Sequence, residues 1–202
     1  AYSIVIKAFA QEGRLKEATA WLQTLASPDI EAFNTVLHGY ARVGQVEEAE
    51  AWMARAQFVG LSPTAVSYTS LVDACAKSGR LGAALHFVRQ AAKSGVATAF
   101  LYHAAIDAYA KQGCLADAEK LFDEMEAQRL EPGREAFTGL VHAAARSGQP
   151  AEVAESWLRR AEAAGRVDVM LVQPASISIV QSVASVRIKV HLIVEILASV
   201  RS

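Results

Sequence analysis

Three residue types return five times along this chain at nearly constant spacing, and no other feature constrains its fold as much. An aromatic residue recurs at intervals of 31, 35, 34 and 35 residues, at Tyr2, Phe33, Tyr68, Tyr102 and Phe137. An alanine follows each aromatic residue by eight positions, at Ala10, Ala41, Ala76, Ala110 and Ala145. A glycine follows each alanine by three positions, at Gly13, Gly44, Gly79, Gly113 and Gly148. A period of this length is typical of stacked repeats, each of which buries its apolar face only against its neighbours.

The second repeat indicates which structure each repeat adopts. From Phe33 to Tyr40, apolar residues recur at steps of three and four, which predicts a helix over about residues 32–43. Gly44 supplies the backbone conformation that ends a helix, and a second helix is expected over residues 46–58. Pro63 then closes the repeat, because proline cannot continue a helix. The sequence therefore predicts an all-α fold, a right-handed α-solenoid of about five helical hairpins.

The landmarks also divide the chain. The expected repeats span residues 1–29, 30–64, 65–98, 99–133 and 134–165. The spacing from Tyr2 to Phe33 is four residues shorter than the spacing from Phe33 to Tyr68, and we expect this deletion in the turn that connects the first two hairpins. In the fifth repeat, Pro150 predicts a second helix that starts late and extends to Ala164. The tryptophans follow helical spacing, so we expect Trp21, Trp52 and Trp157 in the core rather than on a surface that stacks bases.

The tail over residues 166–202 lacks the repeat and allows three interpretations. Apolar residues recur at steps of three and four between Val183 and Val200, which suits a helix that caps the open end of the stack. Residues 186–192 also alternate as a strand would. The third interpretation is that the tail is not under the same structural constraint. Because the chain opens at Ala1 inside a repeat, we expect a fragment whose targeting segment, if any, is missing.

Composition narrows the classes of function. The net charge is -1, so any attraction to nucleic acid must come from a local arrangement of cations. Cys75 and Cys114 lie 39 residues apart without a Cys-x-x-Cys pattern, which favours buried thiols over a zinc site or a disulfide. No cofactor is expected. The sequence contains no run of 18 uncharged apolar residues, so no membrane association is expected either.

Catalysis is not expected from this chain. The sequence lacks the His-x-Glu and Cys-x-x-Cys signature of nucleic-acid deaminases, and it lacks an acidic cluster that would hold two metal ions. His38 and His142 occupy the same column of the repeat and lie 104 residues apart, so they reflect repetition rather than a catalytic pair.

Two families of helical hairpins have periods of about 34 to 35 residues. The tetratricopeptide repeat places a small residue directly after the leucine of its first helix. That column is bulky here, with Ile6, Leu37, Val72, Ile106 and Val141. The segments Phe33–Leu37, Lys77–Leu81 and Leu121–Met125, the last with Pro132 behind it, resemble the opening, the turn and the close of the pentatricopeptide repeat. Over residues 1–165 the chain therefore resembles the pentatricopeptide repeat family.

The resemblance implies single-stranded RNA binding at one base per hairpin. It also implies a role in RNA processing, stabilisation or editing in an organelle, chloroplast or mitochondrion. In that family the fifth and the last residue of a repeat face the base. The fifth residues here are Ser3, Asn34, Thr69, His103 and Thr138, and the last residues are Asp29, Thr64, Thr98 and Gly133. Small hydroxyl and amide groups suit this task because they donate and accept hydrogen bonds over a short reach.

The resemblance further implies base preferences. Ser3 with Asp29 is expected to prefer guanine, Asn34 with Thr64 a pyrimidine, and Thr69 with Thr98 a purine, with the RNA running 5′ to 3′ from the N- to the C-terminus. The family also favours an apolar second residue that packs beside the bases. Val66 and Phe100 fit this preference, whereas Glu31 and Glu135 do not.

A column of cations supports the same interface. The thirteenth residue of the repeats is Arg42, Lys77, Lys111 and Arg146, with Gln11 in the first repeat. Cations spaced one hairpin apart have the geometry needed to contact successive phosphates. The alternative is that each cation favours the dipole at the C-terminus of its helix, by a few tenths to about 1 kcal/mol. A second function also stays open, a scaffold that binds protein or peptide partners on the concave surface of the solenoid.

Overall fold

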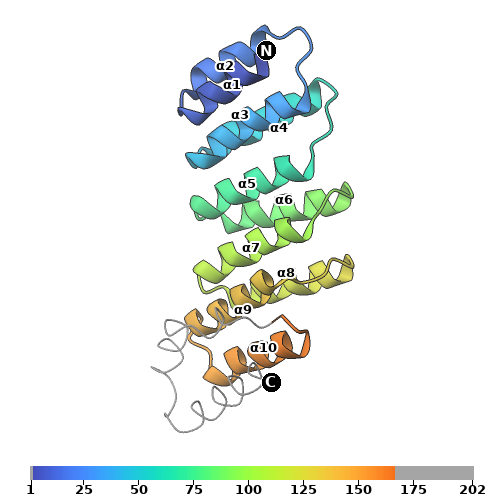
Figure 1. Cartoon of the computed structure of the whole chain (residues 1–202). Coiled ribbons are helices and arrows are strands. Elements are labelled where there is room, and N and C mark those ends of the chain that lie inside the picture. The colour runs from blue at the N-terminus through green and yellow to red at the C-terminus, as the bar shows by residue number, and fades with distance from the viewer. Residues whose placement is uncertain (1, 167–202) are drawn as a thin grey trace, which may run out of the picture. The chain divides into compact units, whose positions relative to one another are not determined.

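The computed structural model describes residues 2–166, and these residues form ten α-helices and no strand (Figure 1). The helices are α1 (Tyr2–Gln11), α2 (Leu15–Thr24), α3 (Ile30–Arg42), α4 (Val46–Phe58), α5 (Ala65–Lys77), α6 (Leu81–Lys93), α7 (Ala99–Lys111), α8 (Leu115–Ala127), α9 (Arg134–Arg146) and α10 (Ala151–Ala163). The prediction of an all-helical chain built from hairpins is confirmed. The three interpretations of the tail concern residues 167–202, which lie outside the described residues.

The helices belong to two compact modules. The N-terminal module spans Ala1–Ala108, and the C-terminal module begins at Tyr109, so the boundary lies inside α7. In the N-terminal module α1 packs on α2, α3 on α4 and α5 on α6, while α3 also contacts both α1 and α5. In the C-terminal module α9 packs on α8 and on α10. Among the helices described, none combines the length and the apolarity that crossing a membrane requires.

Each hairpin turns at its repeated glycine, as predicted. The five glycines have φ between 71° and 77°, the left-handed region that an L side chain rarely adopts. At the end of α3, the Gly44 amide donates to the Ala41 carbonyl at 3.1 Å, and the Gln45 amide donates to the Tyr40 carbonyl at 3.1 Å. These two bonds form a Schellman motif, which satisfies carbonyls that a helix end leaves open. The glycine column is therefore a column of helix stops.

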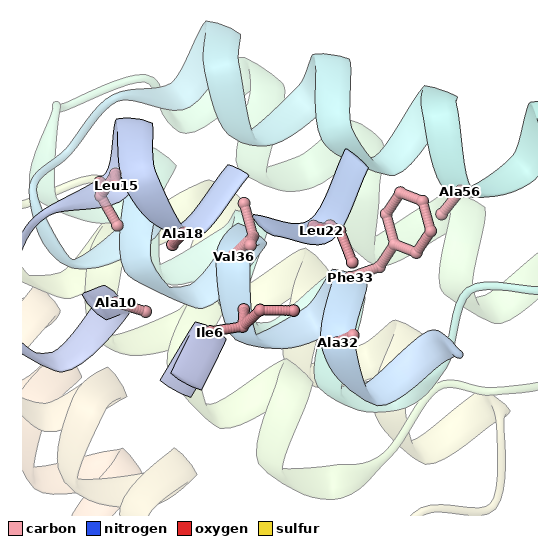
Figure 2. Packing of buried hydrophobic residues seen from close by; sticks show 9 residues of the cluster. All are labelled: Ile6, Ala10, Leu15, Ala18, Leu22, Ala32, Phe33, Val36 and Ala56. Carbon is pink, nitrogen blue, oxygen red and sulfur yellow. The ribbon is translucent and has the colours of Figure 1, made fainter. Parts of the chain in front are cut away.

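The core of the N-terminal module joins side chains from successive hairpins. Ile6 of α1, Leu22 of α2 and Phe33 of α3 are each at most 3% exposed, and Figure 2 shows them directed toward a common interior together with Ala56 of α4. Phe33, the repeated aromatic residue, also lies 5.9 Å from the Trp52 ring, measured between centroids. The described side chains of the aromatic column, Phe33, Tyr68, Tyr102 and Phe137, are all buried. The column is therefore core, as predicted.

The tryptophans follow that prediction only in part. Trp157 is 8% exposed and Trp52 is half-buried against Phe33. Trp21 is 39% exposed, so its placement in the core was wrong. It occupies the same column as Trp52, eight residues after the repeated glycine. The physical reason is that burial in a stack comes from neighbouring hairpins, and within the described residues the first hairpin packs on its neighbour mainly through α3.

The deletion in the first repeat lies mainly in its second helix, which corrects the expectation that it lies in the turn. Helix α2 has 10 residues, whereas α4 has 13. Its chain leaves the helix at Leu25, whose ψ of 127° is extended. Pro28 follows closely, and the residue before a proline is disfavoured in the helical region. The fifth repeat behaved as expected, since α10 begins at Ala151 directly after Pro150.

Overpacking at a helix contact provides a first test of this arrangement. Ala49 of α4 is 0% exposed, so Ala49→Leu is expected to lower the free energy of unfolding by about 1 to 3 kcal/mol. Ala51→Leu on the exposed side of the same helix is the control, because the added side chain there meets solvent. Denaturant titration of both variants gives the comparison. Equal midpoints for the two would show that Ala49 does not lie between packed helices.

The two cysteines differ in burial, and this difference predicts a dependence on pH. Cys75 is 0% exposed, and burial raises the pKa of its thiol from 9.0 to about 11. The neutral thiol therefore stabilises the fold fully below pH 9.0, and this contribution is lost as the pH rises toward about 11. We expect the wild type to lose more stability over that interval than Cys75→Ala does.

Under native conditions an alkylating reagent should modify the half-buried Cys114 first.

Candidate nucleic-acid interface

The residues predicted as the last of each repeat all precede a first helix. Asp29, Thr64 and Gly133 are the N-caps of α3, α5 and α9, and Thr98 directly precedes α7. An Asp29 carboxylate oxygen accepts from the Ala32 amide at 2.8 Å. The Thr98 hydroxyl accepts from the Leu101 amide at 3.3 Å. Side-chain oxygens at this position satisfy amides that a helix start leaves open, so Asp29 and Thr98 have a structural role whatever the column binds.

The fifth residues lie within the first two turns of the first helices of the hairpins, with less uniform surroundings. Ser3 is exposed, whereas Asn34, Thr69, His103 and Thr138 are half-buried. The hydroxyls of two of them donate to the carbonyl one turn earlier in their own helix: Thr69 to Ala65 at 2.8 Å and Thr138 to Arg134 at 2.9 Å. The protons of these hydroxyls are thereby engaged, and their oxygens remain acceptors.

One predicted pair is brought into direct contact across two hairpins. The Asn34 side-chain amide nitrogen of α3 donates to the Thr64 hydroxyl at 3.2 Å, although the residues are 30 apart in sequence. Because α3 packs on α5, the fifth residue of one repeat meets the residue that caps the next first helix. The structure therefore places together two residues that sequence analysis connected only through the family resemblance.

The cation column lies where predicted. Arg42, Lys77, Lys111 and Arg146 are the last residues of α3, α5, α7 and α9, and all four are exposed. The Lys77 ammonium pairs with the Asp73 carboxylate at 2.5 Å, and the Arg146 guanidinium donates to the Lys111 carbonyl at 2.8 Å. Within the described residues, Arg42 forms no hydrogen bond or ion pair through its side chain. Lys77 and Arg146 therefore have structural contacts, whereas the charge of Arg42 is uncommitted within the described part of the chain.

A groove in the N-terminal module collects several of these residues. It runs over α1, α3 and α5, and its volume is about 250 Å³. The lining residues are Lys7, Ala10, Gln11, Asn34, Thr35, His38, Gly39, Arg42 and Val66. They include two cations and no carboxylate, so the groove favours an anionic ligand. Val66, predicted to pack beside a base, is 59% exposed and adds an apolar surface to the groove. Phe100, in the same column, is 68% exposed.

Sequence analysis missed His38, which lines this groove, and the buried Ser67 and Ser70, which contact lining residues. His38 lines it one helical turn after Asn34, and its Nδ1 lies 3.4 Å from the hydroxyl of the buried Ser70 of α5. The buried Ser67 of α5 contacts both Asn34 and Thr64. A signal for Ser67 was present, because a polar side chain three residues after an N-cap threonine has the spacing of a capping box. His38 could have been found from its position on the helix face between Asn34 and Arg42.

Comparisons with known proteins agree with this geometry. The chain matches the PPR repeat family over residues 28–77 and the PPR repeat over residues 1–25, 66–96 and 100–130, together more than half of its length. The pentatricopeptide repeat-containing protein At5g43790 of Arabidopsis thaliana is 28% identical over 118 residues, which are 58% of this chain and 26% of that protein. This chain therefore spans about a quarter of that relative's length.

Solved structures with RNA are also similar. The maize pentatricopeptide repeat protein PPR10 in complex with an 18-nt psaJ RNA element superposes with a TM-score of 0.70 at 23% identity, covering 89% of this chain and 26% of that one. The PPR domain of Arabidopsis thaliana protein-only RNase P 1 in complex with tRNA gives a TM-score of 0.71 at 11% identity, covering 90% and 98%. At these identities the likeness shows the fold.

Proposed function

Because this chain belongs to the pentatricopeptide repeat family, we propose that it binds single-stranded RNA selectively, with successive hairpins addressing successive bases. One observation carries the proposal. The groove over α1, α3 and α5 combines an amide side chain, two cations and an apolar surface, in Asn34, Lys7, Arg42 and Val66. These are the groups needed to meet a base edge, a phosphate and a base face.

The proposal assigns a role to each column. The fifth and last residues address base edges: Ser3 with Asp29 guanine, Asn34 with Thr64 a pyrimidine, and Thr69 with Thr98 a purine. His103 with Gly133 departs from the usual pairs and is assigned no base. Arg42, Lys77, Lys111 and Arg146 contact phosphates at the helix ends. The RNA runs 5′ to 3′ from the N- to the C-terminal repeat.

The biological setting is part of the proposal. We infer a role in processing, stabilising or editing RNA within a chloroplast or a mitochondrion, where proteins of this family act. The related structures support the RNA part, because PPR10 and the protein-only RNase P 1 domain were crystallised with RNA. Their repeats are helical hairpins of the kind described above. This chain would then supply recognition rather than chemistry.

Binding of short single-stranded RNA by the purified chain tests the proposal. The RNA panel has guanine at the position that faces the first repeat and adenine at the position that faces the third. At the position that faces the second repeat, each of the four bases is tested in turn. Affinity should fall between about 50 and 200 mM salt, with a slope near −0.7 for each phosphate contacted. A duplex of the same sequence should bind more weakly, because its base edges are paired. Equal affinity for duplex and single strand would contradict the proposed mode.

A second candidate function is peptide binding. The observation that favours it is another groove of about 360 Å³ in the N-terminal module, whose lining combines apolar side chains such as Leu22, Trp52 and Leu61 with the polar Gln23, Ser27 and Arg55. Val59, directly after α4, lines this groove and is exposed, and the neighbouring Phe58 is exposed as well. If RNA does not bind at low salt while an apolar peptide does, this function replaces the first.

A further inference from the structure

Two serines of α5, Ser67 and Ser70, are the polar residues buried in the described part of the chain, at 2% and 5% exposure. Ser67 contacts Asn34 and Ser70 contacts His38, and both of these side chains line the groove over α1, α3 and α5. We infer that Ser67 is a positioning residue, which sets the hydrogen-bonding group that Asn34 offers to a base. The part of the inference that is measured on RNA rests on the proposed function. If it holds, the base preference of the second repeat depends on a residue of the third repeat, Ser67.

The direction of the Ser67 bond follows from its partners. The Ser67 hydroxyl accepts from the Thr64 backbone amide at 3.0 Å, so its single proton is available for another group. That proton goes to the Asn34 Oδ1 atom, at an oxygen–oxygen distance of 2.6 Å. Bonds of the O–H···O type are commonly about 2.7 Å long, and N–H···O bonds about 2.9 Å. The short distance therefore identifies the carbonyl end of the Asn34 amide at Ser67.

The other end of the amide is fixed in the same way. The Asn34 Nδ2 atom lies 3.2 Å from the Thr64 hydroxyl oxygen, a length that suits an N–H donor. An amide nitrogen carries two N–H groups, and one is used here. The second is left for the groove that Asn34 lines. Rotating the amide by half a turn would put Nδ2 at 2.6 Å from the Ser67 oxygen, which is closer than N–H···O bonds usually are, so the orientation in which Asn34 presents its second N–H is preferred.

This arrangement defines the chemistry of the ligand. A side chain held as a donor selects a base edge that presents an acceptor, such as the carbonyl oxygens of a pyrimidine. The threonines at the equivalent positions behave oppositely, because Thr69 and Thr138 donate to carbonyls of their own helices and present acceptors. In the other four repeats the position of Ser67 is taken by Ala1, Ala32, Leu101 and Ala136, which have no hydroxyl. A serine hydroxyl that orients the fifth residue of the preceding repeat is therefore specific to the contact between the second and third repeats.

Three substitutions test the inference against four RNAs that differ only at the base facing the second repeat. Ser67→Ala removes the hydroxyl, Ser67→Cys keeps its size with a weaker donor, and Asn34→Asp keeps the shape of Asn34 without its donors. Ser67→Ala should reduce the ratio of best to worst base by about fivefold, with little change in the mean affinity over the four bases. Ser67→Cys should fall between Ser67→Ala and the wild type.

The double variant separates positioning from packing. If Ser67 acts through Asn34, then adding Ser67→Ala to Asn34→Asp should change the base ratio no further. Ser78→Ala is the matched control, because that hydroxyl bonds to the Ala74 carbonyl at 2.8 Å at the other end of α5. An equal loss of affinity for all four RNAs, or additive losses in the double variant, would show that Ser67 is merely structural and overturn the inference.

An arm without RNA distinguishes this inference from the proposed function. The side-chain amide resonances of Asn34, assigned by their absence in Asn34→Asp, should shift in Ser67→Ala and stay unchanged in Ser78→Ala. If the wild type binds no RNA but these resonances shift as expected, the proposed function fails while the contact stands. If the resonances do not respond to Ser67→Ala, the inference fails whether or not RNA binds.

Discussion

Phe122→Ala is expected to lower the free energy of unfolding by about 3 to 5 kcal/mol, the largest loss of stability that we predict for one side chain. Phe122 of α8 is 0% exposed. Its ring centroid lies 5.1 Å from that of Phe137 of α9 and 5.2 Å from that of Trp157 of α10. The Arg160 guanidinium lies 4.8 Å from the same ring. One truncation therefore removes contacts with two neighbouring helices and leaves a cavity between them.

Phe58→Ala provides the matched control. Phe58 ends α4 and is 91% exposed, so the same change of residue there removes little buried surface. Urea titration followed by circular dichroism would compare the two variants with the wild type. A loss below about 1 kcal/mol for Phe122→Ala would mean that the three rings do not form a packed cluster in solution.

The second large effect is expected in RNA binding. Arg42→Ala should weaken all single-stranded RNA sequences alike, by about fivefold, and lower the salt slope by about 0.7. Arg42 lines the groove, is exposed at the end of α3, and has no ion pair within the described part of the chain. Its charge is therefore available to a phosphate. A phosphate contact carries no base information, which is why the loss should not depend on sequence.

Arg55→Ala separates this local effect from a change in net charge. Arg55 of α4 lies 5.4 Å from the Trp52 ring centroid, does not line the groove over α1, α3 and α5, and carries the same charge. Its removal should leave the salt slope close to that of the wild type. A loss confined to one base at one position in Arg42→Ala would instead assign Arg42 to base recognition. Equal losses in both variants would reduce the role of Arg42 to general electrostatic attraction.

Much of the fold could be predicted because its determinants are close together in sequence. The apolar period of a helix and the glycine that ends it lie within a single repeat, and five copies reinforce one another. The length of α2 was harder to predict. A shortened repeat can lose residues from a helix or from a turn while its aromatic residue, alanine and glycine keep their spacing. The exposure of Trp21 was missed for another reason, since burial in a stack depends on which neighbours are present.

The candidate site was predictable as columns but not as contacts. Sequence analysis placed Asn34 and Thr64 in two columns, yet the bond between them depends on how α3 packs on α5. Ser67 is 33 residues from Asn34, and its burial follows from the same packing. Serine also has several ordinary structural uses, so its presence alone indicates nothing. Contacts between repeats need coordinates, whereas properties within a repeat follow from the sequence.

The need for an N-cap restricts which residues can be substituted at the last position of a repeat. Asp29 and Thr64 each begin a helix, and the residues that do so well are aspartate, asparagine, serine and threonine. Those four differ in the donors and acceptors they offer, while each keeps most of the stability of the helix start. If this column addresses bases as proposed, exchanges within this set would change the preferred base at little cost in folding. Natural variation or engineering at this position would thus be limited to a few residues that keep the helix start stable. A leucine or valine there would remove both the N-cap bond and the side-chain hydrogen-bonding group.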